Sequence, residues 1–141
     1  MREELDNKLC AKYPKIFRDR SAPMNQTCMC WGFDHGDGWY NIIDQMCANI
    51  QHHIDWKNKQ SEVVAQVTVN QIKEKFGGLR FYYSGGDDVI DGMVRMAESW
   101  AAHICEEFGA LGKIRGGGWI RTLCDTHEAE RQQHMKERLV E

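Results

Sequence analysis

The sequence predicts an α+β fold in which helices pack on a small antiparallel β-hairpin sheet, with a treble-clef-like knuckle at the C-terminus. Three observations predict this fold. Apolar residues recur at helical spacing in two long segments, two β-rich runs flank Gly77-Gly78, and a glycine-rich hairpin precedes a Cys-x-x-His motif. The 141 residues are expected to form a single domain over 1–141, in which 102–141 can form a zinc-knuckle-like subdomain.

The N-terminal third is predicted to contain a short helix, a long loop and the first long helix. Apolar residues recur at helical spacing from Leu5 to Ile16, and this helix is expected to break near Pro14. Residues 18–38 predict an irregular loop. Asp37 is the expected N-cap of the long helix, because its carboxylate can accept hydrogen bonds from first-turn amides. The apolar face of that helix consists of Trp39, Ile42, Ile43, Met46, Cys47, Ile50 and Ile54.

The middle of the chain is predicted to form a hairpin and a second long helix. β-rich residues run from Val63 to Phe76, Gly77-Gly78 turns the chain, and residues 79–83 form the second strand. Residues 85–88, Gly-Gly-Asp-Asp, are expected to end the hairpin and cap the next helix. That helix is expected to end at Gly109 and Gly112, and its apolar face consists of Ile90, Met93, Val94, Ala97, Ala101, Ile104 and Cys105.

The C-terminal part is predicted to form a second hairpin and a last helix. Residues 111–115 and 119–123 flank the turn Gly116-Gly117-Gly118, and the charged segment from Asp125 to Glu141 favours a helix. The knuckle predicted here therefore consists of a loop, a hairpin and the start of a helix.

The strongest candidate site is a metal site in this C-terminal part. Cys105 precedes the second hairpin, and Cys124 and His127 lie at the start of the last helix, where exposed amides favour a thiolate. Zinc prefers about four nitrogen or sulfur ligands. Phe108 stands where a second knuckle cysteine would lie, and His103 can substitute only if the helix end unwinds. The alternative interpretation is a knuckle that has lost its metal and keeps its cysteines and Phe108 as core.

A second group of residues suggests a weaker metal site and a weaker active site. Cys28 and Cys30 with His35 and Cys47 can hold a soft metal, although Cys47 falls on the apolar face of its helix. Buried thiols are the simpler interpretation. His35, close to two aspartates in the sequence, suggests a small hydrolase as a minor hypothesis. Because no phosphate-binding loop or nucleophile motif is recognisable, a non-enzymatic protein is favoured.

Composition limits the classes of function. Eighteen Lys and Arg residues oppose 21 Asp and Glu, and the net charge of −3 excludes a generally basic nucleic-acid binder. No apolar stretch reaches the ~18 residues of a membrane helix. The first six residues lack the apolar segment of a secretory signal. Six cysteines without such a signal favour a reducing compartment, so we expect a cytoplasmic protein whose cysteines are free or bind a metal.

Four stretches of the chain resemble a known family. They are Lys12–Phe17, Gly36–Asp44, Gln71–Tyr82 and Gly118–His127. The chain resembles, over nearly its whole length, a family of small and functionally unassigned proteins of tailed phages and prophages. The resemblance implies a phage origin and a location in the host cytoplasm. It also implies a zinc knuckle of the form C-x-x-C-G, whose positions are here Cys105, Phe108 and Gly109.

The preferred hypothesis is a non-enzymatic phage accessory protein that binds, and thereby inhibits or modulates, a host protein or host-defence complex. The interface is expected where the loop before the first long helix meets the first hairpin, with Trp39, Phe81 and Tyr82 as anchors. Trp39 can equally belong to the core, because it begins the apolar stripe of its helix. The predicted binding residues are Asp37, Trp39, Tyr40, Lys73, Lys75, Arg80, Phe81 and Tyr82.

The alternative hypothesis is a protein that binds nucleic acid or a nucleotide through its two hairpins. Basic residues alternate with aromatic ones on the first hairpin, and residues 109–123 include no acidic residue. The simpler interpretation is that the strand lysines face water. An exposed edge of the first hairpin also suggests a homodimer.

Overall fold

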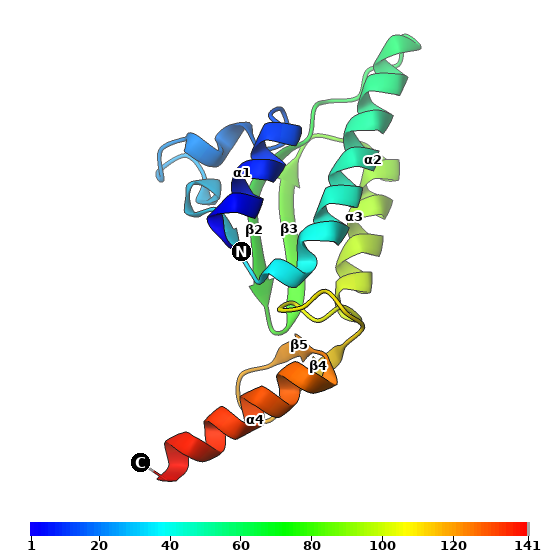
Figure 1. Ribbon diagram of the computed structural model, residues 1–141. Helices are drawn as coiled ribbons and strands as arrows, with labels where there is room; N and C mark the ends of the chain where they lie inside the picture. The colour runs from blue at the N-terminus through cyan, green and yellow to red at the C-terminus, as the bar shows by residue number, and fades with distance from the viewer. Residues whose placement is uncertain (141) are drawn as a thin grey trace.

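The computed structural model describes residues 1–140 and confirms an α+β protein. Figure 1 shows a three-stranded sheet with helices packed around it, and a smaller hairpin with the last helix at one end of the molecule. The elements in chain order are α1 (Glu3–Lys12), η1 (Arg18–Ser21), η2 (Cys28–Trp31), β1 (Phe33–Asp34), η3 (Asp37–Trp39), α2 (Tyr40–Lys59), β2 (Thr68–Lys75), β3 (Gly78–Ser84), α3 (Asp88–Ala101), β4 (Lys113–Arg115), β5 (Arg121–Leu123) and α4 (Asp125–Val140).

The main sheet has the order β1-β2-β3. The predicted antiparallel hairpin of β2 and β3 is confirmed, with Ile72 opposite Phe81. The sequence did not predict β1, which pairs in parallel with β2 and places Phe33 beside Ile72. A strand of two residues is too short to show an alternating pattern, so nothing local identifies it. The sheet is therefore mixed rather than purely antiparallel.

The core lies between the sheet and the helices α2 and α3. On α2 the predicted apolar face is confirmed, because Ile43, Cys47 and Ile50 are fully buried and Ile42 is half-buried. On α3 the residues Ile90 and Val94 are buried in the same cluster. Helical periodicity therefore identified the core faces of both long helices.

Two element boundaries differ from the prediction and a third agrees with it. Helix α1 ends at Lys12, close to Pro14 as expected, because a residue before proline, here Tyr13, disfavours the helical conformation. Strand β2 begins at Thr68. The Asn58 side chain accepts a hydrogen bond from the Val64 amide and donates one to the Val64 carbonyl, so both backbone groups of Val64 are bonded outside the sheet. Helix α3 ends at Ala101, so the residues that follow it form the loop of the knuckle.

Of the two predicted helix caps, one is confirmed. The Asp87 carboxylate accepts a hydrogen bond from the Ile90 amide at 3.0 Å and caps α3. Asp37 does not cap α2, because that helix begins three residues later at Tyr40. The Asp37 carboxylate instead accepts a hydrogen bond from the backbone amide of Arg2 at 2.8 Å.

The second hairpin and the last helix are confirmed as β4, β5 and α4. Strands β4 and β5 pair antiparallel, with Lys113 opposite Leu123. The predicted last residue of the helix, Glu141, lies outside the described residues.

At the edge of the main sheet, the Phe81 amide of β3 donates a hydrogen bond to the Glu98 carboxylate at 3.0 Å. This bond occupies one backbone donor of that edge strand. None of the helices within residues 1–140 has the length and hydropathy needed to cross a membrane.

Candidate metal centre

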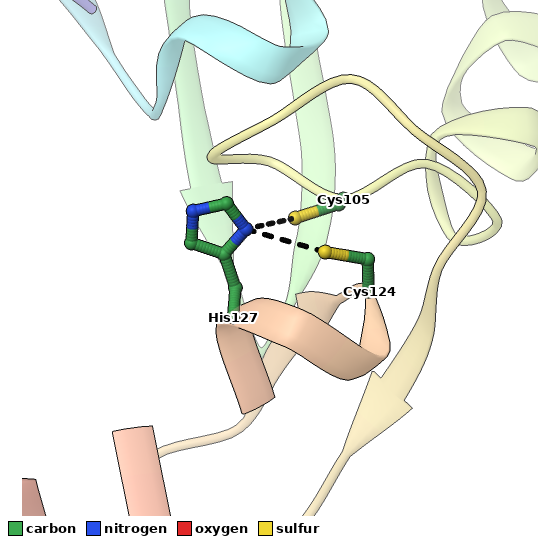
Figure 2. A group of neighbouring side chains, drawn as sticks. All are labelled: Cys105, Cys124 and His127. Carbon is green, nitrogen blue, oxygen red and sulfur yellow. Dashed lines mark hydrogen bonds between the residues drawn. The ribbon is translucent and has the colours of Figure 1, made fainter. Parts of the chain in front are cut away.

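Three potential metal ligands meet where the knuckle loop, β5 and α4 come together. Figure 2 shows the imidazole of His127 directed at the thiols of Cys105 and Cys124. The Nδ1 atom of His127 lies 3.7 Å from the Cys105 sulfur and 3.2 Å from the Cys124 sulfur. The three ligand atoms all lie within 4.8 Å of one another. This group can hold a metal ion.

The distances between the ligand atoms suit a tetrahedral zinc site. Zinc binds cysteine sulfur at about 2.3 Å and histidine nitrogen at about 2.05 Å, so tetrahedral angles place sulfur and nitrogen about 3.6 Å apart. The two observed sulfur–nitrogen distances, 3.2 and 3.7 Å, lie on either side of this value. Two thiols and one imidazole are also ligands that prefer zinc or another soft metal to magnesium or calcium.

The position of Cys124 favours the thiolate form that a metal requires. The backbone amide and the imidazole of His127, together with the Cys105 side chain, lower the pKa of Cys124 to about 7 against the opposing effect of desolvation. Cys124 immediately precedes α4, where the unpaired amides of the first turn stabilise negative charge. On the other side of the imidazole ring, Nε2 lies 3.9 Å from a carboxylate oxygen of Glu130.

Of the four ligands predicted for the C-terminal site, His103 is the one that the structure does not bring to the other three. Helix α3 has ended before it, but its exposed ring packs on Trp100, with 5.4 Å between ring centroids. Phe108 lies beside the site and places its ring 5.5 Å from that of His127. The phenyl ring offers no ligand atom, so the protein supplies three ligands.

The knuckle has little apolar core of its own. Its buried cluster consists of Cys105, Leu123 and Cys124, and no residue of α4 is buried. Backbone hydrogen bonds hold the loop, among them one from the Gly109 amide to the Cys105 carbonyl at 2.8 Å. In so small a unit, metal–ligand bonds can supply cohesion that apolar burial does not.

The knuckle packs against the segment Gly36–Trp39. A Cβ atom at Gly36 would overlap the Glu106 carbonyl, and one at Gly38 would overlap the Cys105 carbonyl. The Gly38 amide donates to the Glu106 carbonyl at 2.6 Å, and the Trp39 indole donates to the Ile104 carbonyl at 2.9 Å. The two glycines therefore let two backbones approach closely, which explains the Gly-Asp-Gly-Trp motif as a structural contact.

The structure divides the predicted binding surface into core and surface residues. Trp39 is 0% exposed, which confirms the alternative that it belongs to the core, and Phe81 is 3% exposed, so neither side chain can anchor a partner at the surface. Asp37 and Tyr40 are half-buried, and the Tyr40 ring lies under the Lys8 ammonium group. Tyr82 is exposed on β3. An apolar stripe does not show which aromatic side chains remain at the surface.

The basic residues of the two hairpins differ in their partners. Arg115 lies 2.7 Å from the Asp125 carboxylate, and Arg121 forms ion pairs with Glu106 and Glu107. These two arginines of the second hairpin are therefore neutralised within the fold. In the first hairpin, Lys73 and Arg80 are half-buried and Lys75 is exposed.

The second predicted metal site is not assembled. Cys28 is exposed, the Cys30 thiol lies 3.3 Å from the Thr27 carbonyl, and Cys47 is buried in the core of α2. Within residues 1–140, the grouping of three or more ligand side chains is confined to the C-terminal centre. The prediction of a metal bound by Cys28, Cys30, His35 and Cys47 is therefore wrong.

His35 is buried rather than accessible to a substrate. Its Nδ1 atom lies 2.8 Å from the Gly36 carbonyl oxygen, and Nε2 has no hydrogen-bond partner within the described residues. Burial lowers the pKa of His35 to about 4. A base in this environment is held neutral and away from solvent, which removes the geometric basis of the hydrolase hypothesis.

We expect this burial to make the fold acid-sensitive. The unfolded chain binds a proton at His35 near pH 6.5, whereas the folded protein does so near pH 4. The contribution of His35 to the free energy of unfolding is therefore fully present above pH 6.5. It is lost as the pH drops toward 4, which lowers the free energy of unfolding by about 3 kcal/mol. Urea unfolding of His35→Gln should show a smaller loss between pH 7 and 4 than the wild type. The exposed-site variant His103→Gln serves as the control, and equal losses in all three proteins would contradict the prediction.

Comparisons of the chain with protein-family models, with curated proteins and with solved structures found no match.

Proposed function

We propose that the protein binds one zinc ion through Cys105, Cys124 and His127. The observation that carries this proposal is the convergence of two sulfur atoms and one nitrogen atom at separations suited to tetrahedral zinc. The ion would join the loop after α3 to the start of α4. Its role would be structural, since it would hold together a knuckle whose buried cluster has only three residues.

Metal analysis of the purified protein tests this proposal. We expect about one zinc per chain, as a single site of this kind binds one ion. Cys105→Ser, Cys124→Ser and His127→Asn should each lower the zinc content, while Cys28→Ser, which changes an exposed cysteine, should retain it. A chelator should increase amide hydrogen exchange in residues 104–124. Equal zinc content in all variants, or a protein without metal, would contradict the proposal.

We further propose that the protein is a non-enzymatic accessory protein of a tailed phage that acts in the host cytoplasm by binding a host protein or host-defence complex. The four sequence stretches that resemble phage and prophage proteins support this role. The exposed Tyr82 supplies an aromatic contact at the predicted interface.

Co-purification from nuclease-treated host lysate tests the proposed role. We expect a single host protein to be recovered with the wild type and lost with Tyr82→Ala. Trp56→Ala, at another exposed aromatic residue, is the matched control. Recovery of the same protein by Tyr82→Ala would contradict the proposed interface, and recovery of none by the wild type would contradict the proposed role.

A further inference from the structure

We propose that a groove between the two hairpins binds single-stranded nucleic acid. This hairpin groove has a volume of about 370 Å³ and lies between the β2–β3 turn and the loop that precedes β5. In Figure 1 the turn of β2 and β3 lies next to the second hairpin. The inference concerns a site separate from the zinc centre and does not require a protein partner. The groove is lined by Lys73, Glu74, Lys75, Phe76, Gly118, Trp119 and Ile120.

Phe76 has a backbone conformation that its side chain does not favour. Its φ angle is +52° and that of Gly77 is +79°, so both central residues of the turn are left-handed. Asn or Gly normally occupies such positions, because a bulky side chain is strained there. The Phe76 side chain is 71% exposed, so burial does not compensate for the strain. Its contact within the fold is with the Lys75 ammonium group, which lies 5.8 Å from the ring centroid. Backbone strain that burial does not offset is typical of binding positions.

Side-chain hydrogen bonds hold the backbone next to both exposed aromatic residues, Phe76 and Trp119. The Thr122 hydroxyl donates to the Gly77 carbonyl at 2.6 Å and fastens the β2–β3 turn to β5. The Arg131 guanidinium donates to the carbonyls of Trp119 and Gly116, each at 2.8 Å, and fixes the glycine-rich loop to α4. The Trp119 side chain is nevertheless 76% exposed. The backbone that carries the two rings is therefore held in place before any ligand binds.

Three cations of the first hairpin have no anionic partner, and two of them, Lys73 and Lys75, line the groove. Lys73 and Arg80 lie directly opposite each other on β2 and β3, an arrangement of like charges that destabilises a sheet. Throughout residues 1–140, no carboxylate forms an ion pair with Lys73, Lys75 or Arg80. Glu74, which also lines the groove, accepts a hydrogen bond from the Gly77 amide at 2.7 Å. An anionic ligand would relieve the repulsion that the fold leaves in place.

Single-stranded nucleic acid matches this combination of groups. Unpaired bases can stack on Phe76 and Trp119, while phosphates can pair with the three cations. A duplex hides the faces of its bases, so it would use the cations alone. Protein interfaces are depleted in lysine, which makes a protein the less suitable ligand for this groove.

Fluorescence anisotropy tests the proposal on the full chain. The labelled ligands are oligo(dT) and oligo(U) of 12 nucleotides and a duplex of equal length. Both single strands should bind, and the duplex more weakly. With three phosphate contacts, the logarithm of the affinity should fall with the logarithm of the salt concentration with a slope of about 2. Trp119→Ala should lower the affinity about 5- to 150-fold, the value of one stacked base.

Phe76→Gly distinguishes loss of binding from loss of folding. Glycine relieves the strained conformation, so this variant should unfold at a higher temperature than the wild type while its oligonucleotide affinity falls. Two matched controls, Trp56→Ala and Lys59→Ala, alter exposed residues on α2 and should bind like the wild type.

Three results would overturn the proposal. They are no binding of either strand at 50 mM salt, equal affinity for duplex and single strand, and unchanged affinity in both Trp119→Ala and Phe76→Gly. None of them bears on zinc content, so failure here leaves the metal centre to its own test. Binding of one strand type alone would support the proposal and identify DNA or RNA as the ligand.

Discussion

Replacing Phe108 with cysteine is expected to raise the affinity for zinc by at least about tenfold. Loss of a residue that only supports a metal ligand costs about 10–100-fold in affinity, so a new direct ligand should have an effect at least as large. The substitution creates a Cys-x-x-Cys knuckle with Cys105, and the side chain at position 108 already lies beside His127. Competition with a chromogenic chelator measures the change.

Phe108→Ser is the matched control for this experiment. It removes the same ring contact with His127 but adds no sulfur ligand, so its zinc affinity should stay close to that of the wild type. An equal affinity in Phe108→Cys and Phe108→Ser would show that position 108 does not face the metal. The fourth coordination position would then belong to solvent or to a group outside the knuckle.

Trp39→Ala is expected to lower the free energy of unfolding by about 3–5 kcal/mol, the usual cost of removing a large aromatic side chain from a core. The Trp39 side chain is fully buried, and its indole bonds the Ile104 carbonyl at the base of the knuckle. Urea unfolding measures the loss. Because the same side chain contacts the knuckle, hydrogen exchange in residues 104–109 should increase as well.

Two further substitutions separate the contribution of the Trp39 hydrogen bond from that of apolar burial. Trp39→Phe keeps most of the apolar contact but leaves the Ile104 carbonyl unpaired, which should cost about 1–3 kcal/mol. Trp119→Ala removes an indole that is 76% exposed and should change the stability by less than about 0.5 kcal/mol. A stable Trp39→Ala protein that no longer binds a partner would instead support Trp39 as an interface residue.

Local sequence is sufficient to predict those features of the fold that depend on neighbouring residues. The apolar faces of α2 and α3 follow from spacing along the chain, and the β2–β3 hairpin follows from Gly77-Gly78. The Asp87 cap depends on an amide three residues away. Cys105, Cys124 and His127 were also identified, because one short hairpin connects them.

Contacts between distant segments account for the predictions that were wrong. Trp39 immediately precedes α2 and fits both an interface and a core position by its spacing, and its burial together with its hydrogen bond to Ile104, 65 residues away, places the indole in the core. Strand β1 exists because Phe33 meets Ile72 across the sheet. His103 is a different case, because a local contact decides it: its position close to Cys105 in the sequence suggests a ligand, yet its ring packs on Trp100, three residues earlier.

The sequence by itself determined the α+β class, the two core helices, both hairpins and the three residues that can hold a metal, since each depends on short-range periodicity, turn residues or ligand spacing. Only the tertiary structure decided which side chains remain free to bind. It buries Trp39 and His35, neutralises Arg115 and Arg121, and leaves the groove at Phe76 exposed and positively charged. The physical reason is that burial and charge pairing depend on which distant segments meet in the folded chain.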